Sequence, residues 1–415
     1  MPRSVESAAR PRHGGTVVND RVIVVGAGPV GLTCAALLAR AGIPVLLLEA
    51  TLERARDLRA STWHPPTLDM IEELGFAEPL IARGLITPTW QVRMHPSGER
   101  AEFDLGVLAD ETRHPYRLQC EQQVYCELLE AHLAGLGGVC SLRRGVAFAG
   151  VRQSASAIVV EAREPDEATV ELEATWLIGA DGARSAVREA VGLHLEGSTY
   201  PETTILATTT FPFEQHLEGL SNVNYCWSPH GTFSLLRLPH LWRVSLYADA
   251  EESMAQALRR ESIEVKLQRI VPTGRLHDVL EARPYRIHRR IAPSYRAGRV
   301  LLAGDAAHLN SPSGGMGMNG GLHDAFNLCD KLARVWHGEA DALLDLYVRQ
   351  RRPVAQEQII AQAHQNRTRM QERDPGKRLK MLRDLQAIAA SPERAREHLL
   401  KTSMIAGLRQ AAQTA

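Results

Sequence analysis

The sequence of 415 residues contains few cysteines and no spacing that would pair them or hold a metal ion. Its six cysteines are scattered without a C-x-x-C pair, which favours reduced thiols in the cytoplasm over a disulfide framework. The 16 histidines contain no H-E-x-x-H motif, so we expect no metal site. The fold must therefore depend on an apolar core, for which 44% hydrophobic residues are sufficient.

An excess of one charge is also missing, and so are long apolar runs. Lys+Arg and Asp+Glu both number 48, so no global field draws the protein to nucleic acid or to an anionic membrane. No apolar run reaches the roughly 18 residues of a membrane-spanning helix, and we expect no stable membrane insertion. Residues 1–20 are polar and lack the apolar segment of a secretory signal, which predicts a disordered lead-in.

A strand–helix–strand pattern is present directly after this lead-in. Val22–Val25 is an apolar run typical of a buried parallel strand, and the glycine-rich segment Gly26–Gly31 follows it. Leu32–Ala41 is rich in Ala and Leu and predicts a helix, and Pro44–Leu48 predicts a second strand that ends at Glu49. This order indicates a βαβ unit of the Rossmann type.

The later sequence changes character and then returns to the first pattern. Residues 197–285 contain strand-like segments between Pro-containing turns, which indicates an antiparallel sheet. We predict an α/β fold: a Rossmann-type domain with an inserted, mainly antiparallel β-sheet lobe and C-terminal helices. The expected boundaries are 21–86, 117–196 and 286–350 for the Rossmann-type domain, 87–116 and 197–285 for the lobe, and 351–415 for the helices.

The first chemical signal is Gly26-x-Gly28-x-x-Gly31 between the strand and the helix. In such a motif the first glycine allows a tight turn, the second lets the backbone approach a pyrophosphate, and the third permits close helix–strand packing. The helix N-terminus then offers free N–H groups to the phosphates. Glu49 is placed to accept hydrogen bonds from a ribose. Read alone, the motif indicates a dinucleotide without naming it.

Two further segments follow predicted strands. Asp181–Arg188 begins with an Asp-Gly turn and, as a bare pattern, predicts a helix capped by Ser185. Gly304-Asp305 follows the apolar run 300–303, and a carboxylate at a strand end can accept hydrogen bonds from sugar hydroxyls. Gly314–Asn319 adds a flexible turn before a helix, whose amides could stabilise a negative charge on a bound group.

Taken together, these segments resemble the FAD-dependent aromatic hydroxylases, the single-component flavin monooxygenases of the para-hydroxybenzoate hydroxylase type. Asp181–Arg188 resembles their D-G-x-x-S-x-V-R segment, and Arg299–His308 resembles their G-D motif. The resemblance covers about residues 21–350 and implies that FAD is the cofactor. The FAD-binding residues that it implies are Gly26, Gly28, Pro29, Val30, Gly31, Glu49, Arg59, Glu121, Asp181, Gly304, Asp305, Pro312, Gly315, Gly317, Met318 and Asn319.

The resemblance also implies an activity. A small phenolic or pyridinol-type aromatic substrate would be hydroxylated with O₂ through a flavin C4a-hydroperoxide, with NADH or NADPH as a transient co-substrate. The alternatives are an FAD-dependent reductase or another flavin enzyme on the same scaffold, such as a halogenase, or a flavin-binding regulatory protein. For the charged C-terminal helices we expect either a cover over the FAD domain or a contact in a homodimer.

Hydroxylation of a phenol requires a base or relay near its hydroxyl. The candidate catalytic residues are His230, His240 and Tyr225 on the lobe, and Pro312 beside the flavin and substrate. A histidine or tyrosine in these positions is more often a packed or surface residue. Arg237 and Arg243 are candidates for binding a substrate carboxylate, and solvent-facing positions are equally compatible with their spacing.

Overall fold

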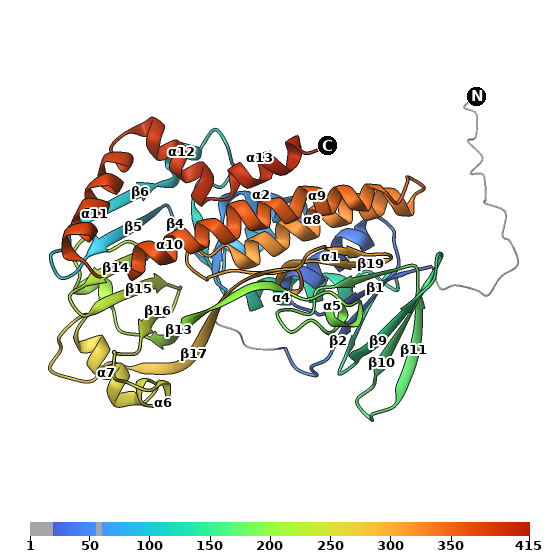
Figure 1. Cartoon of the computed structure of the whole chain (residues 1–415), viewed down its shortest axis with the longest axis horizontal. Coiled ribbons are helices and arrows are strands. Elements are labelled where there is room, and N and C mark those ends of the chain that lie inside the picture. Colours follow the sequence, from blue (N-terminus) through green and yellow to red (C-terminus); the bar gives the residue numbers. More distant parts are fainter. Residues whose placement is uncertain (1–19, 55–59) are drawn as a thin grey trace, which may run out of the picture.

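The computed structural model describes residues 20–54 and 60–415, and it has the predicted α/β fold (Figure 1). A six-stranded sheet has the order β18-β19-β12-β1-β2-β8 and is parallel except at the β18–β19 edge. Every residue of β1 (Val22–Val25) is buried, as its apolar run predicts. The other strands are β2 (Val45–Glu49), β8 (Cys140–Arg144), β12 (Trp176–Gly179), β18 (Arg296–Ala297) and β19 (Val300–Leu302).

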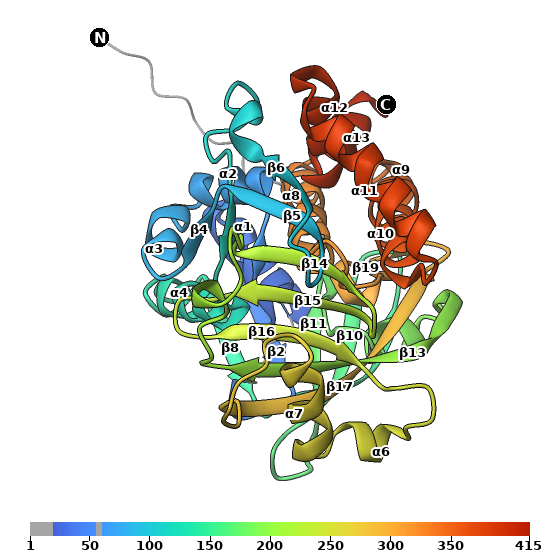
Figure 2. The same cartoon turned by 90° about the vertical axis from the view of Figure 1, so that its left-hand side faces the viewer.

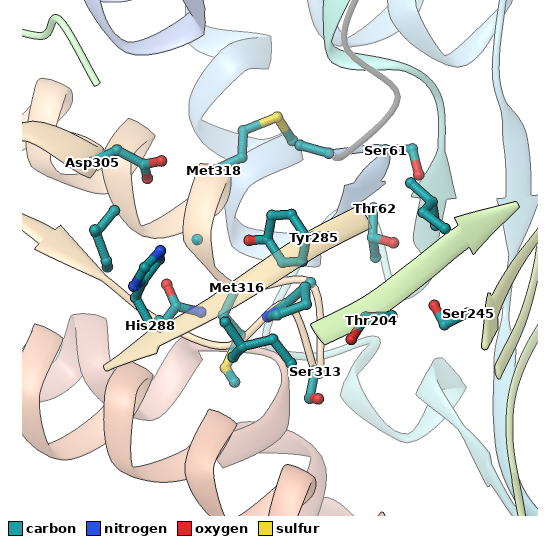
Figure 3. A pocket seen from close by; sticks show the side chains of 18 of the residues that line it. Ser61, Thr62, Thr204, Ser245, Tyr285, His288, Asp305, Ser313, Met316 and Met318 are labelled. Atoms are coloured by element: carbon teal, nitrogen blue, oxygen red, sulfur yellow. The ribbon is translucent and has the colours of Figure 1, made fainter. Parts of the chain in front are cut away.

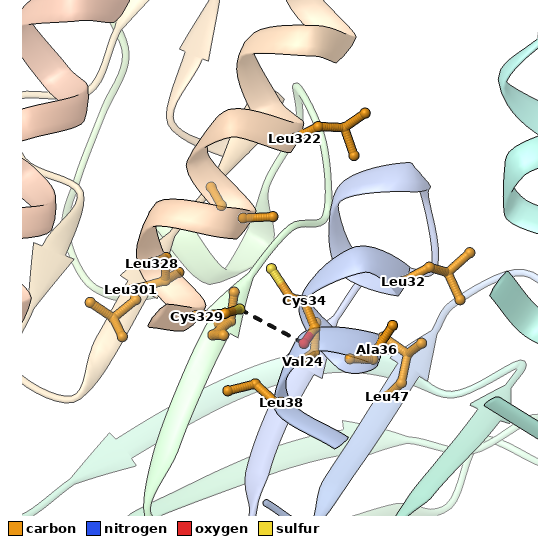
Figure 4. Packing of buried hydrophobic residues seen from close by; sticks show 14 of the residues in the cluster. Val24, Leu32, Cys34, Ala36, Leu38, Leu47, Leu301, Leu322, Leu328 and Cys329 are labelled. Atoms are coloured by element: carbon orange, nitrogen blue, oxygen red, sulfur yellow. Dashed lines mark hydrogen bonds between the residues drawn. The ribbon is translucent and has the colours of Figure 1, made fainter. Parts of the chain in front are cut away.

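Two helices pack together against this sheet, α1 (Pro29–Arg40) and α8 (Gly317–Trp336). Helix α1 begins at Pro29, three residues before the predicted start, because proline suits the first helical position. Figure 4 shows the contact, in which the Cys329 thiol faces the Cys34 carbonyl at 3.7 Å. All six cysteines are buried and unpaired, so they serve as small apolar residues of the core.

The second large sheet has eight strands in the order β20-β17-β13-β16-β15-β14-β5-β6 and is antiparallel except between β14 and β5. Residues 87–116 and 197–285 both contribute strands to it. Helices α6 (Met254–Ala257) and α7 (Arg260–Gln268) lie below it in Figure 2. The strands are β5 (Thr89–Met94), β6 (Arg100–Asp104), β13 (Glu196–Thr209), β14 (Val223–Ser228), β15 (Gly231–Arg237), β16 (Trp242–Tyr247), β17 (Val279–Ile291) and β20 (His308–Leu309).

The C-terminal helices extend from one large sheet to the other. Helix α9 (Leu343–Val354) packs on α8, whereas α11 (Pro375–Ala389) contacts β6 and α12 (Pro392–Thr402) contacts the 3-10 turn Leu105–Leu108. These helices therefore cover the sheet lobe as well as the Rossmann-type domain (Figures 1 and 2). The remaining helical segments here are the π-helical turn Ala355–Ile360, α10 (Ala361–Gln371) and α13 (Ile405–Gln413).

Smaller elements complete the chain. One three-stranded sheet is formed by β3, β7 and β4, and another by β11, β10 and β9. Within residues 20–54 and 60–415 there is no helix with the length and apolarity needed to cross a membrane. The bounds are β3 (Thr62–Trp63), β4 (Leu85–Thr87), β7 (Arg117–Gln119), β9 (Ala147–Gln153), β10 (Ile158–Arg163), β11 (Thr169–Ala174), α2 (Pro65–Glu73), α3 (Ala77–Ile81), α4 (Gln122–Ala134) and α5 (Ala186–Ala190).

Candidate active site

A cavity of about 890 Å³ lies between the Rossmann-type domain and one face of the eight-stranded sheet. This volume is within the usual range of about 300–1,000 Å³ for ligand pockets. Figure 3 shows Asp305 and Met318 at one end of it, Thr204 and Ser245 at another, and Tyr285 between them. We call this space the main cavity.

The glycine motif reaches the main cavity with its backbone. Gly26 has a φ of +103°, and a Cβ atom there would lie 2.4 Å from the Ala180 carbonyl oxygen. A Cβ atom on Gly31 would lie 1.8 Å from the Gly26 carbonyl oxygen. At Gly28, by contrast, no described atom lies within 4 Å of the added Cβ. Gly28, Pro29 and Val30 line the cavity, so the N-terminus of α1 is open to a phosphate group.

Glu49 fixes the shape of the glycine loop. One of its carboxylate oxygens accepts a hydrogen bond from the Ala27 amide at 2.8 Å, and the other accepts bonds from the Thr51 amide and hydroxyl. The Glu49 side chain is half-buried and does not line the main cavity. Arg59, which the resemblance implies as a further FAD contact, lies outside the described residues.

Asp181 faces away from the main cavity. Its carboxylate accepts hydrogen bonds from the Ser185 hydroxyl at 2.5 Å and from the Val187 amide at 3.1 Å. Burial raises the pKa of Asp181, although these hydrogen bonds oppose that effect. Ser185 in turn caps α5. The backbone next to Asp181 does line the cavity, at Ala180 and at 182–184.

The Gly304-Asp305 turn places Asp305 in the lining of the main cavity. Behind it, the buried carboxylate of Asp324 accepts hydrogen bonds from the Gly304 amide at 3.2 Å and from Arg351 at 2.7 Å, and it pairs with His308 at 2.8 Å. Burial alone would raise the pKa of Asp324, but Arg351 and His308 outweigh it and hold that pKa below its ordinary value. The network therefore fixes the turn that carries Asp305.

The glycine-rich turn before α8 is held by Asn319. The Asn319 side chain donates to the carbonyl oxygens of Thr62 at 2.8 Å and Gly315 at 2.7 Å, and it accepts from the His64 amide at 3.0 Å. Asn319 is fully buried, so its side chain positions the turn rather than lining the cavity. Pro312, Gly315, Gly317 and Met318 do line the cavity.

The segment that leads into α4 differs from the expectation by one residue. Glu121 is the N-cap of α4 and does not line the main cavity, whereas Gln122 does. The resemblance identified the segment but left its register open, because three polar residues follow one another at 121–123.

The candidates on the sheet lobe separate clearly. Tyr225 lines the main cavity. For His230 and His240, the expectation that they line the substrate side is corrected. Both lie in exposed turns at the ends of β15 and outside the cavity lining. Arg243 is buried, lines the cavity and donates to the Ser61 hydroxyl at 2.5 Å. Arg237 pairs with Glu214 at 3.1 Å and does not line the cavity.

Sequence reasoning missed several residues of the sheet face. His288 lines the cavity and bonds to the Thr199 hydroxyl at 2.9 Å through Nδ1. Burial and the nearby Arg290 and Arg286 lower the pKa of His288. Period-two alternation along β13 and β16 was the available signal, since it places every second residue on one face. The additional lining residues on this face include Thr204, Leu206, Thr208, Ser245, Tyr247, Tyr285 and His288.

One cluster outside the cavity has metal-ligating residue types. Ligand atoms of Asp69, Glu72 and His114 lie within 4.8 Å of one another. The Asp69 carboxylate already accepts hydrogen bonds from Thr112 and His114, and Glu72 pairs with Arg113. These contacts account for the cluster as a tie between α2 and the loop that precedes β7.

Comparisons with known proteins agree with the geometry. Residues 19–362 match the family described as FAD binding domain. The chain is 36% identical to para-nitrophenol 4-monooxygenase of Pseudomonas sp. strain WBC-3, over 87% of this chain and 90% of that protein. It is 33% identical to 6-hydroxy-3-succinoylpyridine 3-monooxygenase of Pseudomonas putida, over 86% and 91%.

Solved structures give the same result. The crystal structure of p-nitrophenol 4-monooxygenase from Pseudomonas putida DLL-E4 superposes with a TM-score of 0.87 at 32% identity, covering 94% of this chain and 98% of that one. Aklavinone-11 hydroxylase, solved with FAD and aklavinone, gives a TM-score of 0.75 at 26% identity, covering 86% and 70%.

Proposed function

This chain belongs to the FAD-dependent aromatic monooxygenases, and from that premise we propose that it hydroxylates a small phenolic or pyridinol-type ring, using O₂ and NADH or NADPH. The observation that carries the proposal is the main cavity. Backbone turns of the FAD domain form one side of it, and a sheet face rich in polar and aromatic side chains forms the other.

The cofactor side fits FAD. The open space at Gly28 and the N-terminus of α1 suit a pyrophosphate. Asp305 would then accept hydrogen bonds from the ribityl hydroxyls, and the backbone of Gly315–Met318 would lie against the flavin ring. Reduced FAD supplies the activation of O₂ that these monooxygenases require.

The sheet side would hold the aromatic ring against the flavin. Tyr225 and Tyr285 offer aromatic surface, and Arg243, Ser245 and Thr204 offer hydrogen-bonding groups on the same face. Packing of the ring in this space would exclude water from the reacting atoms. Gly26–Gly31 is the G-x-G-x-x-G motif that lies between a strand and a helix of the βαβ unit, whereas the second match, Gly315–Gly320, leads into α8 without a preceding strand of that unit. With one dinucleotide motif for FAD, NADH or NADPH would act from the side of the cavity lined by the exposed Arg184 and Arg286.

The proposed function can be tested with the purified holoprotein. Its visible spectrum should show bound flavin, and a screen of phenols and pyridinols should identify compounds that accelerate NADH or NADPH oxidation with formation of a hydroxylated product. Product oxygen should derive from O₂ in an isotope-labelling experiment. Bound flavin that no aromatic compound helps to reduce would contradict the hydroxylase and favour a reductase.

A further inference from the structure

A second, much smaller cavity lies beside the main cavity, where the same sheet face continues into β14 and β5. It holds about 20 Å³, which is enough for one atom the size of a water oxygen. Tyr225, Ser313 and Met370 line both cavities and form the wall between them. The other lining residues come from β5, β7, the turn before α8, and the helices α10 and α12: Trp90, Val92, Arg117, Gly314, Asn366, Arg369 and Thr402.

Arg117 is the unusual residue of this small cavity. It is only 2% exposed, and within the described part of the chain its Nε and Nη1 atoms have no hydrogen-bond partner. Its guanidinium lies 5.2 Å from the centre of the Trp90 ring and interacts with the Tyr225 side chain. Burial lowers the pKa of Arg117, and the contact with Tyr225 opposes this only in part. A buried cation with unused donors is costly unless something accepts its hydrogen bonds.

The surroundings add positive charge rather than neutralise it. Arg369 also lines the small cavity, and burial lowers the pKa of Arg369. His398 stacks on Phe103 nearby and adds no charge of its own near neutral pH, because burial together with Arg369 and Arg117 lowers its pKa to about 4. None of the residues that line the small cavity is Asp or Glu. An anion is therefore the ligand that this position would stabilise most.

We propose that Arg117, with Tyr225 and Arg369, forms an anion subsite that receives one negatively charged oxygen of the aromatic substrate. The ring would lie in the main cavity, and its oxygen would pass between Tyr225 and Ser313. The inference rests on the proposed function and narrows it, because it selects substrates that bind as phenolates or that carry another compact anionic group. The guanidinium would supply charge-assisted hydrogen bonds to that oxygen.

The subsite also gives the C-terminal helices a role. Asn366, Arg369 and Met370 belong to α10, and Thr402 ends α12. These helices therefore complete the binding site from a part of the chain that lies after the FAD-binding segments. Neither a cover over the FAD domain nor a dimer contact would require this.

The test uses 4-nitrophenol and the holoenzyme, because the absorbance of this phenol reports its ionisation directly. Bound to the wild-type protein, it should remain ionised at a pH at least about one unit below that for the free phenol, which corresponds to a tenfold preference for the phenolate. Arg117→Met should abolish this preference, and Arg117→Lys should restore part of it. Retention of flavin and of the melting temperature would show that Arg117→Met is folded.

The matched control is Arg237→Met, which removes an arginine from β15 of the eight-stranded sheet, outside both cavities, and should leave the preference unchanged. Sodium chloride titration forms a second arm. Chloride should compete with 4-nitrophenol in the wild type and lose this effect in Arg117→Met. A third outcome is that chloride competition depends on Arg117 but the preference for phenolate does not. The site would then bind a free halide, and the proposal would be overturned.

The remaining outcomes are equally decisive. The subsite is refuted if Arg117→Met changes neither the ionisation of bound 4-nitrophenol nor the competition by chloride. It is also refuted if the wild-type protein does not bind 4-nitrophenol. Hydroxylation of phenols that is indifferent to Arg117 would refute the subsite and leave the proposed function standing. A preference for phenolate that depends on Arg117, without any hydroxylation, would support the subsite and refute the proposed function.

Discussion

The two sides of the main cavity differ in the atoms that they present to it. On the cofactor side, turns at Gly28, Gly304 and 315–317 present backbone to the cavity, whereas on the sheet side alternate residues of separate strands present side chains. A backbone surface tolerates change in the surrounding side chains, and a side-chain surface does not. The relatives share the FAD-binding fold while their names refer to different aromatic compounds, as this division of the cavity would allow.

The largest expected effect comes from replacing Asp324, a side chain on the cofactor side. This replacement tests whether the backbone surface of that side depends on a buried side chain behind it. Asp324→Ala would leave the Arg351 guanidinium buried without its carboxylate and would free the Gly304 amide. Loss of one partner of a buried pair costs about 3–5 kcal/mol. We expect a loss of that size in the free energy of unfolding, measured by urea denaturation, together with weaker FAD retention.

The control for Asp324→Ala is an exposed ion pair. Arg152 contacts Glu161 and Glu171 on an exposed strand surface, and Arg152→Ala should change the free energy of unfolding by about 0–1 kcal/mol. If Asp324→Ala were equally mild, the Gly304-Asp305 turn would hold its shape through backbone alone.

Two glycines of one motif provide the next test. Gly31→Ala would place a Cβ atom against the Gly26 carbonyl oxygen, whereas Gly28→Ala meets no described atom within 4 Å. Overpacking of this kind costs about 1–3 kcal/mol or more, so Gly31→Ala should lower the melting temperature. Gly28→Ala should leave the melting temperature of the apoprotein unchanged and weaken FAD binding, measured by titration with the cofactor. Equal behaviour of the two variants would remove the distinction between packing and binding within the motif.

These two sides also explain how much of the site could be predicted. The cofactor side depends on glycines, a proline and an acid at fixed short spacings. The sequence therefore predicted Gly28–Val30, Asp305, Pro312, Gly315, Gly317 and Met318 for the cofactor site, and these residues do line the main cavity. The sequence did not predict the direction in which each of these side chains points. The side chains of Asp181 and Asn319 form hydrogen bonds with neighbouring residues instead of lining the cavity. In the segment before α4, Gln122 lines the cavity and Glu121 does not.

The sheet side could be predicted as a fold but not as a site. Its strands were visible in the alternation of the sequence, yet strands β13, β16 and β17 meet only through pairings over long sequence distances. His230 and His240 were chosen for their chemistry, and both lie in turns. Arg117 carried no signal in the sequence, because its surroundings come from β5, β14 and the C-terminal helices.

The sheet side itself is tested by two arginines on neighbouring strands. Arg243 is buried and lines the main cavity, and Arg237 is half-exposed and pairs with Glu214. Arg243→Met should raise the KM for an aromatic substrate by roughly 10- to 100-fold, since an interaction of about 1.4–2.7 kcal/mol is lost. Arg237→Met should leave KM within about threefold. Steady-state kinetics with FAD-saturated protein would separate these results, and equal KM values would place the substrate elsewhere.

The last test concerns the response of the cofactor side to acid. His323 on α8 is buried and bonded to Thr67, and burial followed by Arg351 lowers its pKa to about 3. In the unfolded chain a histidine has a pKa of about 6.5, so protonation favours the unfolded state as the pH falls below that value. The stability contributed by neutral His323 is therefore present above about pH 6.5 and lost toward pH 3, at about 1.4 kcal/mol per pH unit. Urea denaturation at several pH values should show this slope in the wild type and a shallower one in His323→Gln. An unchanged slope would mean that the acid sensitivity of the cofactor side comes from other groups, of which the fully buried His64 is the first to test.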